Sequence, residues 1–473
     1  MRLIQLILFT TTLLFTACNL SESTGCDDNS SIVPPFVPPT CSDPNYFTPG
    51  YDISQEASKE NRMLVIQLDY RNQHFINGEN SWSDKIFGTN NHQLNHYMRS
   101  VSQGNFTYSP VAEGGGDNNG VLSVCFDTDH PDPNVDIGSQ FHPDLSDAIR
   151  NVSSLGFDFS IYDTNRDGRI TPDELLVVFI MAGEEDAYNG GSSRNGIWAH
   201  EYCTEPQYTP VVNGVSVMGC ASTPTEADGS YAIFGERHRD FSDDHDATIG
   251  IIAHELGHAA LRLPDLYDVF GRSAGIGGFG LMSTGSWGQA TNSEYPGATP
   301  THLSAWSKID VGWVQPEVKS SINNSLVNLY GTNESNYNIV KIPINNHEYF
   351  LLENRSRDGY DSGLTTLLEG TYQGGLAIWH IDDDTIAQKR DDNEVNADVR
   401  HKGVDLEEAN DPRMDNSSNN FGHANNLFFS TNKSEFTPTT VPNTNSYTTS
   451  SGIYIENISA VSTQMHASIT NPN

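Results

Sequence analysis

Residues 254–258 contain two histidines four residues apart, with a glutamate directly after the first, which is the HExxH spacing. On a helix, residues four apart lie one above the other, so His254 and His258 can both reach one metal ion. Glu255 would then point toward a metal-bound water and act as its general base. Zinc suits these ligands because it binds neutral imidazole and lowers the pKa of a bound water to about 7. The spacing therefore predicts zinc-dependent hydrolysis of peptide bonds.

A third protein ligand must complete such a site. In the metzincin pattern it follows ten residues after the first histidine, beyond a glycine that turns the chain. Here these positions hold Pro264 and Leu261, and neither side chain can bind zinc. Asp265, one residue later, is the nearest acceptable ligand, since a carboxylate oxygen binds zinc. Asp268 and, more weakly, Glu294 are the alternatives.

A glycine-rich turn around one methionine follows at residues 278–288. In metzincins a methionine turn forms an apolar floor beneath the zinc-binding histidines. Met282 suits that place because a thioether side chain fills irregular space, although a single methionine is also common in ordinary cores. Its location after the HExxH segment favours the floor.

Several segments together resemble the immune inhibitor A family of secreted bacterial metalloproteases. The resemblance implies a secreted zinc endopeptidase with a metzincin-like catalytic domain, an acidic third zinc ligand and bound calcium. The missing glycine and the shift of Asp265 by one residue are departures from the expected pattern. The matching segments extend over about residues 61–465 and are residues 157–163, 197–200, 254–258, 263–268, 281–287, 300–306, 349–355 and 375–382.

Residues 163–174 fit the twelve positions of an EF-hand calcium loop. Oxygen-bearing side chains occupy positions 1, 3 and 5, glycine occupies position 6, and a glutamate capable of bidentate binding occupies position 12. A plain polar turn is the alternative, but no turn requires the final glutamate. We therefore predict a calcium site with the ligands Asp163, Asn165, Asp167, Arg169 through its backbone carbonyl, and Glu174.

The chain of 473 residues has 61 acidic and 25 basic residues, a formal net charge of −36. This charge disfavours binding to nucleic acid or to anionic membrane surfaces, because both carry phosphate groups. It is compatible with an exported, soluble protein that binds divalent cations. We expect proteins or peptides as the partners, in the role of substrates.

The N-terminus has the pattern of an export signal. Met1 and Arg2 form a short positive region, an apolar stretch follows at residues 3–15, and small residues precede Cys18. The arrangement favours a bacterial lipoprotein with a lipid on Cys18, and a conventional signal peptide is the alternative. Residues 18–60 are rich in Pro, Ser and Asn, which predicts an extended tether. We expect a secreted protein or one attached to the outer-membrane surface through its lipid.

Six cysteines in an exported chain predict disulfides. The preferred pairs are local: Cys203 with Cys220, and Cys26 with Cys41. Cys125 would then be free or buried. A latent form with Cys26 or Cys41 bound to zinc is a less favoured alternative.

The elements that must hold these residues follow an α/β pattern. Apolar runs predict strands at residues 63–68 and 175–182, with helices at 94–101 and 248–261. Beyond residue 315 the apolar runs become short and alternating, as at 339–344 and 453–458, which predicts β structure. We therefore divide the chain into a signal peptide (1–17), a tether (18–60), a metzincin-like zinc protease domain with its calcium loop (61–315), and a β-rich C-terminal domain (316–473).

The function these observations favour is a zinc-dependent endopeptidase that cleaves proteins with metal-activated water. The alternative is a calcium-stabilised surface lipoprotein that binds without catalysis. Glu255 favours the enzyme, because a binding protein has no need of the base. A second calcium site in the C-terminal region is a further hypothesis, with solvated loop acids as the favoured alternative; the acids are Asp382, Asp383, Asp384, Glu407 and Glu408.

Overall fold

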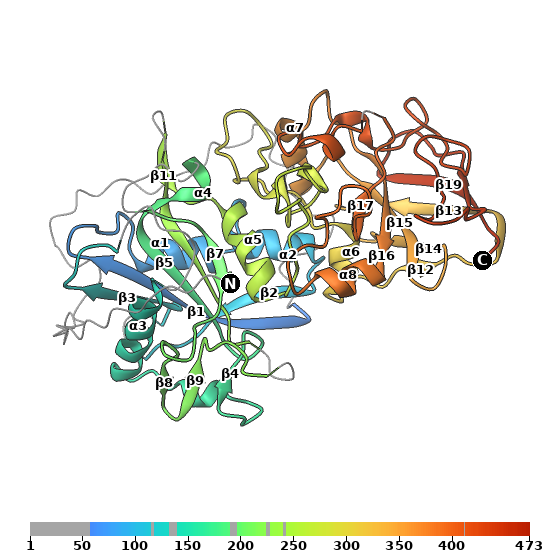
Figure 1. Cartoon of the computed structure of the whole chain (residues 1–473). Helices are drawn as coiled ribbons and strands as arrows, with labels where there is room; N and C mark the ends of the chain where they lie inside the picture. The colour runs from blue at the N-terminus through green and yellow to red at the C-terminus, as the bar shows by residue number, and fades with distance from the viewer. Residues whose placement is uncertain are drawn as a thin grey trace.

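The computed structural model describes residues 57–114, 118–131, 140–189, 196–223, 228–239, 243–410 and 412–473. The expected signal peptide, Cys18, Cys26, Cys41 and the tether as far as residue 56 lie outside these residues. The first strand begins at Lys59, so the last two residues assigned to the tether belong to the folded region. Two β-rich bodies lie side by side, with the HExxH helix between them (Figure 1).

The N-terminal body is built on an eight-stranded sheet with the main order β11-β10-β5-β1-β2. Its strands β2, β3 and β5 pair with β1 in parallel, and β10 pairs in parallel with β5. The antiparallel strands β7 and β11 both pair with β10. The strands are β1 (Lys59–Tyr70), β2 (Phe106–Pro110), β3 (Val121–Phe126), β5 (Leu176–Glu185), β6 (Gly196–Ile197), β7 (His200–Tyr202), β10 (Tyr231–Arg239) and β11 (Asp244–Asp246).

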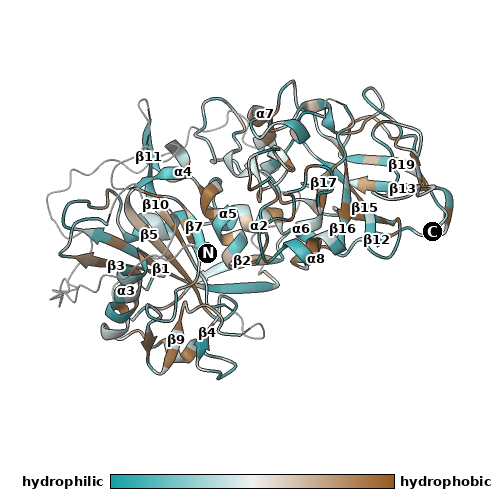
Figure 2. Ribbon diagram, viewed as in Figure 1, coloured by the Kyte–Doolittle hydropathy of each residue, from teal (hydrophilic) through white to brown (hydrophobic). Residues whose placement is uncertain are grey.

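Successive side chains of β1 point to opposite faces of the sheet, and apolar residues on both faces pack against helices. Met63 and Val65 pack with α1 (Glu79–Phe87), α2 (Leu94–Val101) and α5 (Ile249–Ala259) on one face. Leu64 and Ile66 pack with α3 (His142–Ser154) on the other. Figure 2 shows hydrophobic colour along the strands of this sheet. Parallel strands buried on both faces are expected to be apolar throughout, as these are.

The predicted strands and helices of this body are present. The strand expected at residues 63–68 lies inside β1, and the one expected at 175–182 is β5. The helix expected at 94–101 is α2, and the helix expected at 248–261 is α5, which ends earlier, at Ala259.

The C-terminal body consists of two β-sheets, as the alternating apolar runs predicted; most of their strands pair antiparallel, and β12 pairs with β14 in parallel. A five-stranded sheet has the order β12-β14-β15-β16-β17, and a three-stranded sheet has the order β13-β19-β18. Apolar side chains between the two sheets form their own core. The strands are β12 (Glu317–Val318), β13 (Ile322–Tyr330), β14 (Ile339–Pro343), β15 (Glu348–Arg355), β16 (Gly375–Asp382), β17 (Val404–Leu406), β18 (Tyr454–Glu456) and β19 (Gln464–Asn471).

Short elements connect these layers. A small sheet of β4 (Arg169–Ile170), β9 (Val215–Val217) and β8 (Val211–Val212) lies below the large one. The short α-helices are α4 (Asp186–Asn189), α6 (Ala305–Asp310), α7 (Leu364–Leu367) and α8 (Asp383–Lys389). The 3-10 helices are η1 (Phe159–Tyr162), η2 (Gly277–Phe279), η3 (Thr284–Trp287), η4 (Gly359–Gly363), η5 (Met414–Asn416) and η6 (Ala424–Asn426).

One hydrophobic core continues from the first body into the second. The cluster that contains β1 and α5 also contains Leu351 of β15 and Trp379 of β16. The opposite face of the same strands, with Phe350 and Ile378, belongs to the core of the C-terminal body. The five-stranded sheet is therefore covered on both faces. The domain boundary at residues 315 and 316 stays a prediction.

Charged side chains are buried at this junction. Lys308 of α6 lies 2.8 Å from Glu353 of β15, and both side chains are almost fully buried. Arg355 binds Asp361 and also donates to the carbonyl of Phe279, at 2.6 Å. Such pairs resist separation, because removing one partner would leave an uncompensated buried charge.

The disulfides confirm one cysteine prediction and correct another. Cys203 and Cys220 are bonded, as expected. Cys125 is also disulfide-bonded, so the expectation that it is free was wrong. Its partner lies outside the described residues. Spacing along the chain favoured local pairs, but a fold brings distant residues together, which spacing cannot reveal.

Within the described ranges, no helix combines the length and the apolar composition needed to cross a membrane.

Candidate active site

Three potential metal ligands converge at the C-terminal half of α5. The Nε2 atoms of His254 and His258 lie 3.1 Å and 3.3 Å from Oδ1 of Asp265, and 3.3 Å from each other. For ligands about 2.0–2.1 Å from a zinc ion, the edge of a tetrahedron is about 3.3–3.4 Å. The three atoms therefore have nearly the spacing of three corners of a tetrahedral zinc site.

The hydrogen bonds around these groups direct lone pairs toward one point. His254 Nδ1 lies 2.9 Å from the carbonyl of Leu281, and His258 Nδ1 lies 2.6 Å from that of Leu263. A carbonyl only accepts, so both Nδ1 atoms carry a proton, and Nε2 of each ring is the atom that can bind a metal ion in place of a proton. Buried Oδ1 of Asp265 accepts no hydrogen bond from the described residues. These three ligand atoms therefore suit a bound cation.

The chain after α5 explains why Asp265 is in reach although it is one residue beyond the expected position. Arg262 has a left-handed backbone, with φ of 54°, which turns the chain directly after the helix. The N–H of Leu263 then donates to the carbonyl of Gly257, at 3.0 Å. In the metzincin pattern a glycine lets the chain turn back at this point, and here the turn at Arg262 has that role. The turn contains one residue more, so Asp265 takes the place of the ligand.

The two alternative third ligands lie elsewhere. Asp268 is bound by the guanidinium of Arg272 and by the backbone N–H of Phe270. Glu294 accepts hydrogen bonds from the N–H of Ala290 and the hydroxyl of Thr299, each at 2.7 Å. Among the described residues, neither joins the cluster with the histidines, and Asp265 does.

Met282 lies beneath the helix, against Gly257. A Cβ atom built on Gly257 would lie 2.4 Å from Sδ of Met282, so only glycine leaves room for the methionine. The same turn also positions ligands, since Leu281 accepts from His254 and Met282 accepts from the N–H of Leu266 at 2.7 Å. The turn predicted as a floor thus supports both the helix and the segment after it.

Burial and mutual charge shift the pKa values at the site. Burial raises the pKa of Glu255, while the two imidazoles act in the opposite direction. Burial lowers the pKa of His258, but the carboxylate of Asp265 outweighs it and raises that pKa to about 10. The pKa of Asp265 is held well below its usual range, because the imidazoles outweigh its burial. A metal ion bound here would compete with protons for the same atoms.

These residues line a cavity of about 710 Å³. Its floor contains Glu255, and one wall is Trp198, whose side chain is largely exposed, followed by β7. Tyr267 and His200 also line it. Burial lowers the pKa of His200 to about 4, so this histidine is neutral at pH 7. An open cavity beside a three-ligand cluster leaves space for water and for a substrate.

The composition of this site agrees with a comparison of the sequence with known protein families. Residues 139–314 match the family model of the immune inhibitor A peptidase M6 catalytic domain. These residues are therefore similar to the catalytic domain of the immune inhibitor A peptidases. No curated protein matches the chain. The match contains α5, Asp265 and Met282, and it implies a metallopeptidase that acts on proteins or peptides. It confirms the resemblance stated from the sequence.

The predicted calcium loop is closed by its own hydrogen bonds. Glu174 accepts from the N–H groups of Thr164, Asn165 and Thr171. Asp163 accepts from the N–H groups of Asp167 and Gly168. Gly168 has φ of 82°, which explains the glycine at position 6.

Calcium binding stays a prediction for this loop. Asp167 accepts from the N–H of Arg169, whose carbonyl was the fourth of the five predicted ligands. Asp163, Asp167 and Glu174 are not among the described groups that gather three ligand atoms within 4.8 Å. Backbone donors occupy the carboxylates instead.

The acids considered for a second calcium site are not among the described groups that gather three ligand atoms. Asp382 caps α8 by accepting from the N–H of Asp384, and Glu407 lies 3.4 Å from His380. Glu408 is buried and accepts from Asn426 at 3.2 Å. The favoured alternative of solvated loop acids is thus wrong for Asp382 and Glu408, which are buried. A second calcium site stays a hypothesis.

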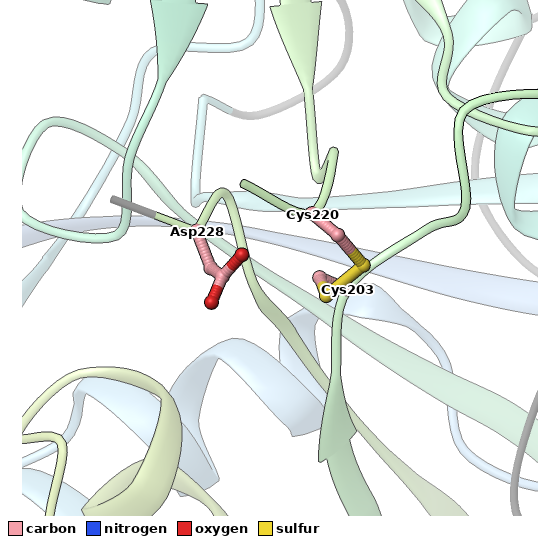
Figure 3. A group of neighbouring side chains, drawn as sticks. All are labelled: Cys203, Cys220 and Asp228. Carbon is pink, nitrogen blue, oxygen red and sulfur yellow. A yellow bond between two sulfur atoms is a disulfide. The ribbon is translucent and has the colours of Figure 1, made fainter. Parts of the chain in front are cut away.

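A second cluster of potential metal ligands is chemically unsuitable. Cys203, Cys220 and Asp228 lie together, but a disulfide joins the two sulfurs (Figure 3). Oxidised sulfur offers no thiolate, and zinc binds cysteine as a thiolate. The disulfide therefore links residues 203 and 220 covalently, and this cluster is not a metal site.

Sequence reasoning missed the part of the cavity wall that comes from the C-terminal body. Arg390, Asp391 and Asn393 line the cavity, although they follow α5 by more than a hundred residues. Glu201 of β7 was also missed, and burial raises its pKa. Nothing in the sequence indicates these residues, because a single side chain on a distant loop carries no spacing pattern.

Proposed function

We propose that the protein is a zinc-dependent endopeptidase with a metzincin-like catalytic domain. The observation that carries the proposal is the convergence of three potential ligand atoms, on His254, His258 and Asp265, at 3.1–3.3 Å from one another. Two imidazoles and one carboxylate form a ligand set typical of zinc sites with an open position. The methionine beneath α5 supports the metzincin-like assignment.

The residues of the chain have separate tasks in this proposal. When bound, zinc supplies a Lewis acid that polarises the peptide carbonyl and lowers the pKa of water to about 7. The carboxylate of Glu255 accepts the proton of the attacking water and then donates it to the leaving amine. Its burial raises its pKa above the ordinary value, which favours its uptake of a proton. His254 and His258 are held in position by the hydrogen bonds of their Nδ1 atoms to the carbonyls of Leu281 and Leu263. Asp265 is held by the hydrogen bond that its Oδ2 accepts from Asn393.

The proposed setting is outside the producing cell, on the basis of the export signal at residues 1–17 and of Cys18. The disulfide between Cys203 and Cys220 supports an oxidising compartment. Attachment through a lipid on Cys18 and a calcium ion in residues 163–174 belong to the same proposal. The non-catalytic alternative is disfavoured because a buried base in a cavity beside three metal ligands has no role in passive binding.

The test is hydrolysis of casein with and without a chelator, using the parent protein and Glu255→Gln. Loss of the base should reduce hydrolysis by about 10²–10⁴-fold while the zinc content stays the same. Chelation should abolish the parent activity, and zinc should restore it. Undiminished hydrolysis by Glu255→Gln would refute this mechanism.

A further inference from the structure

Residues 390–396 of the C-terminal body, here called the clamp segment, bind the chain that follows α5. Arg390 donates to the carbonyl of Arg262 at 2.7 Å, and Asn396 donates to the carbonyl of Leu266 at 2.9 Å. Between them, Asn393 contacts Asp265. Side chains at every third position of the clamp segment thus hold residues 262–266.

Asn393 makes two hydrogen bonds to Asp265. The N–H of Asp265 donates to Oδ1 of Asn393 at 2.7 Å, and Nδ2 of Asn393 donates to Oδ2 of Asp265 at 2.6 Å. Because the backbone N–H can only donate, the amide oxygen must face it, and this fixes the NH₂ group on the carboxylate. The second bond restrains the carboxylate through Oδ2, and its other oxygen, Oδ1, lies 3.1 Å and 3.3 Å from the two histidines.

The clamp segment is itself firmly anchored. Arg390 forms two hydrogen bonds with Asp310, at 3.0 Å and 2.7 Å. Val395 is buried in the continuous core, and Asn396 pairs with Val404 through both its donor and its acceptor. Asn393 has φ of 55°, a left-handed conformation that asparagine tolerates better than most residues. Its backbone and its amide are therefore both suited to this position.

We propose that Asn393 is a positioning residue for the metal centre, which orients Asp265 as the third ligand. The inference rests on the proposed function, since it requires a metal at His254, His258 and Asp265. Partners that orient a metal ligand typically change metal affinity or activity about 10–100-fold when removed. Asn393 lies outside residues 139–314, so the region matched by the peptidase family does not contain its complete metal centre.

The test compares metal binding by the parent, Asn393→Gly and Asn393→Asp in the full chain. Glycine accepts the left-handed backbone and removes both hydrogen bonds. Aspartate keeps the acceptor for the N–H of Asp265 but replaces the donor with an oxygen that repels Oδ2. Zinc affinity is measured by competition with a coloured chelator, and Co²⁺ in place of zinc reports the ligand geometry through its visible absorption spectrum.

Asn393→Gly should weaken zinc binding by about 10–100-fold, and both variants should change the cobalt spectrum. Asn457→Gly is the matched control, because Asn457 is exposed and also has a left-handed backbone, with φ of 53°. It should bind both metals like the parent. Circular dichroism of the metal-free proteins should be the same for all variants.

Two negative outcomes are distinguishable. If the parent binds zinc and both variants match its affinity and cobalt spectrum, Asn393 has no positioning role and the proposed function stands. If the parent itself binds no zinc, the proposed function fails, and the role of Asn393 fails with it.

Discussion

The choice of the third ligand is decided by which atoms remain without a hydrogen-bond partner. Asp265 and Asp268 are both buried and only three residues apart. The carboxylate of Asp268 is occupied by Arg272 and by two backbone N–H groups, whereas Asp265 keeps Oδ1 free. A free buried oxygen beside two imidazole lone pairs is costly unless a cation is bound. The geometry therefore favours Asp265.

Asp265→Ala should lose zinc at neutral pH, because two histidines alone hold the ion weakly. Asp268→Ala should retain stoichiometric zinc, since its carboxylate binds Arg272. Metal analysis of both purified variants after dialysis checks this. The reverse pattern would move the third ligand to Asp268.

At the scale of elements, the sequence was most informative where a pattern is local. The HExxH spacing, the strands of the central sheet and the methionine turn follow from residues that are close in the chain. The contact of Asn393 with Asp265 and the pairing of Cys125 could not be predicted, because they join residues that are far apart in the sequence. The solvated state assumed for Glu408 failed for the same reason, since the residues that bury it come from other parts of the C-terminal body.

Calcium binding to the predicted loop, residues 163–174, can be tested through the stability of the protein. Calcium that binds only the folded form stabilises it by about 2.7 kcal/mol at a hundredfold excess over its dissociation constant. The melting temperature of the parent should rise with calcium, and Glu174→Gln should reduce that rise. Asp173→Asn is the control, because Asp173 forms ion pairs with Lys59 and Arg262 instead of occupying a ligand position. An equal calcium response in Glu174→Gln would mean that the loop is only a turn.

Strand β16 contains a histidine that makes stability depend on pH. His380 lies 3.1 Å from Glu348 of β15. Burial lowers the pKa of His380, but its bonds to Glu348 and Glu407 outweigh this and raise the pKa from 6.5 to about 9. A raised folded-state pKa means that the stabilisation is complete below pH 6.5 and is lost as the pH rises through 9. The loss amounts to about 3 kcal/mol.

His380→Gln should therefore lose less stability than the parent between pH 6.5 and pH 9. The check is a series of urea unfolding curves across this range. His347→Gln is the control, because it removes a histidine whose ion pair with Asp384 is exposed and contributes little to stability. Parallel curves for His380→Gln and the parent would show that His380 does not stabilise the fold through its charge.

For the whole molecule, the continuous core and the buried charges predict that the two bodies unfold together. Lys308→Met would leave Glu353 buried without its ammonium partner, which typically costs about 3–5 kcal/mol. Calorimetry should show a single transition that moves to lower temperature as a unit. Lys319→Met removes a more exposed ion pair with Glu317 and should cost about 0–1 kcal/mol. Two separate transitions, with only one displaced, would contradict this coupling.

The hydrogen bonds between Asp265 and Asn393 can form only after both residues have been synthesised. The two residues are 128 positions apart, so at about 5–20 residues per second the ribosome makes Asn393 roughly 6–26 s after Asp265. A growing chain that already carries both histidines and Asp265 still lacks the residue that orients the carboxylate. In the proposed mechanism, the order of synthesis therefore places the completion of the metal centre after residues 390–396 of the C-terminal body have been made.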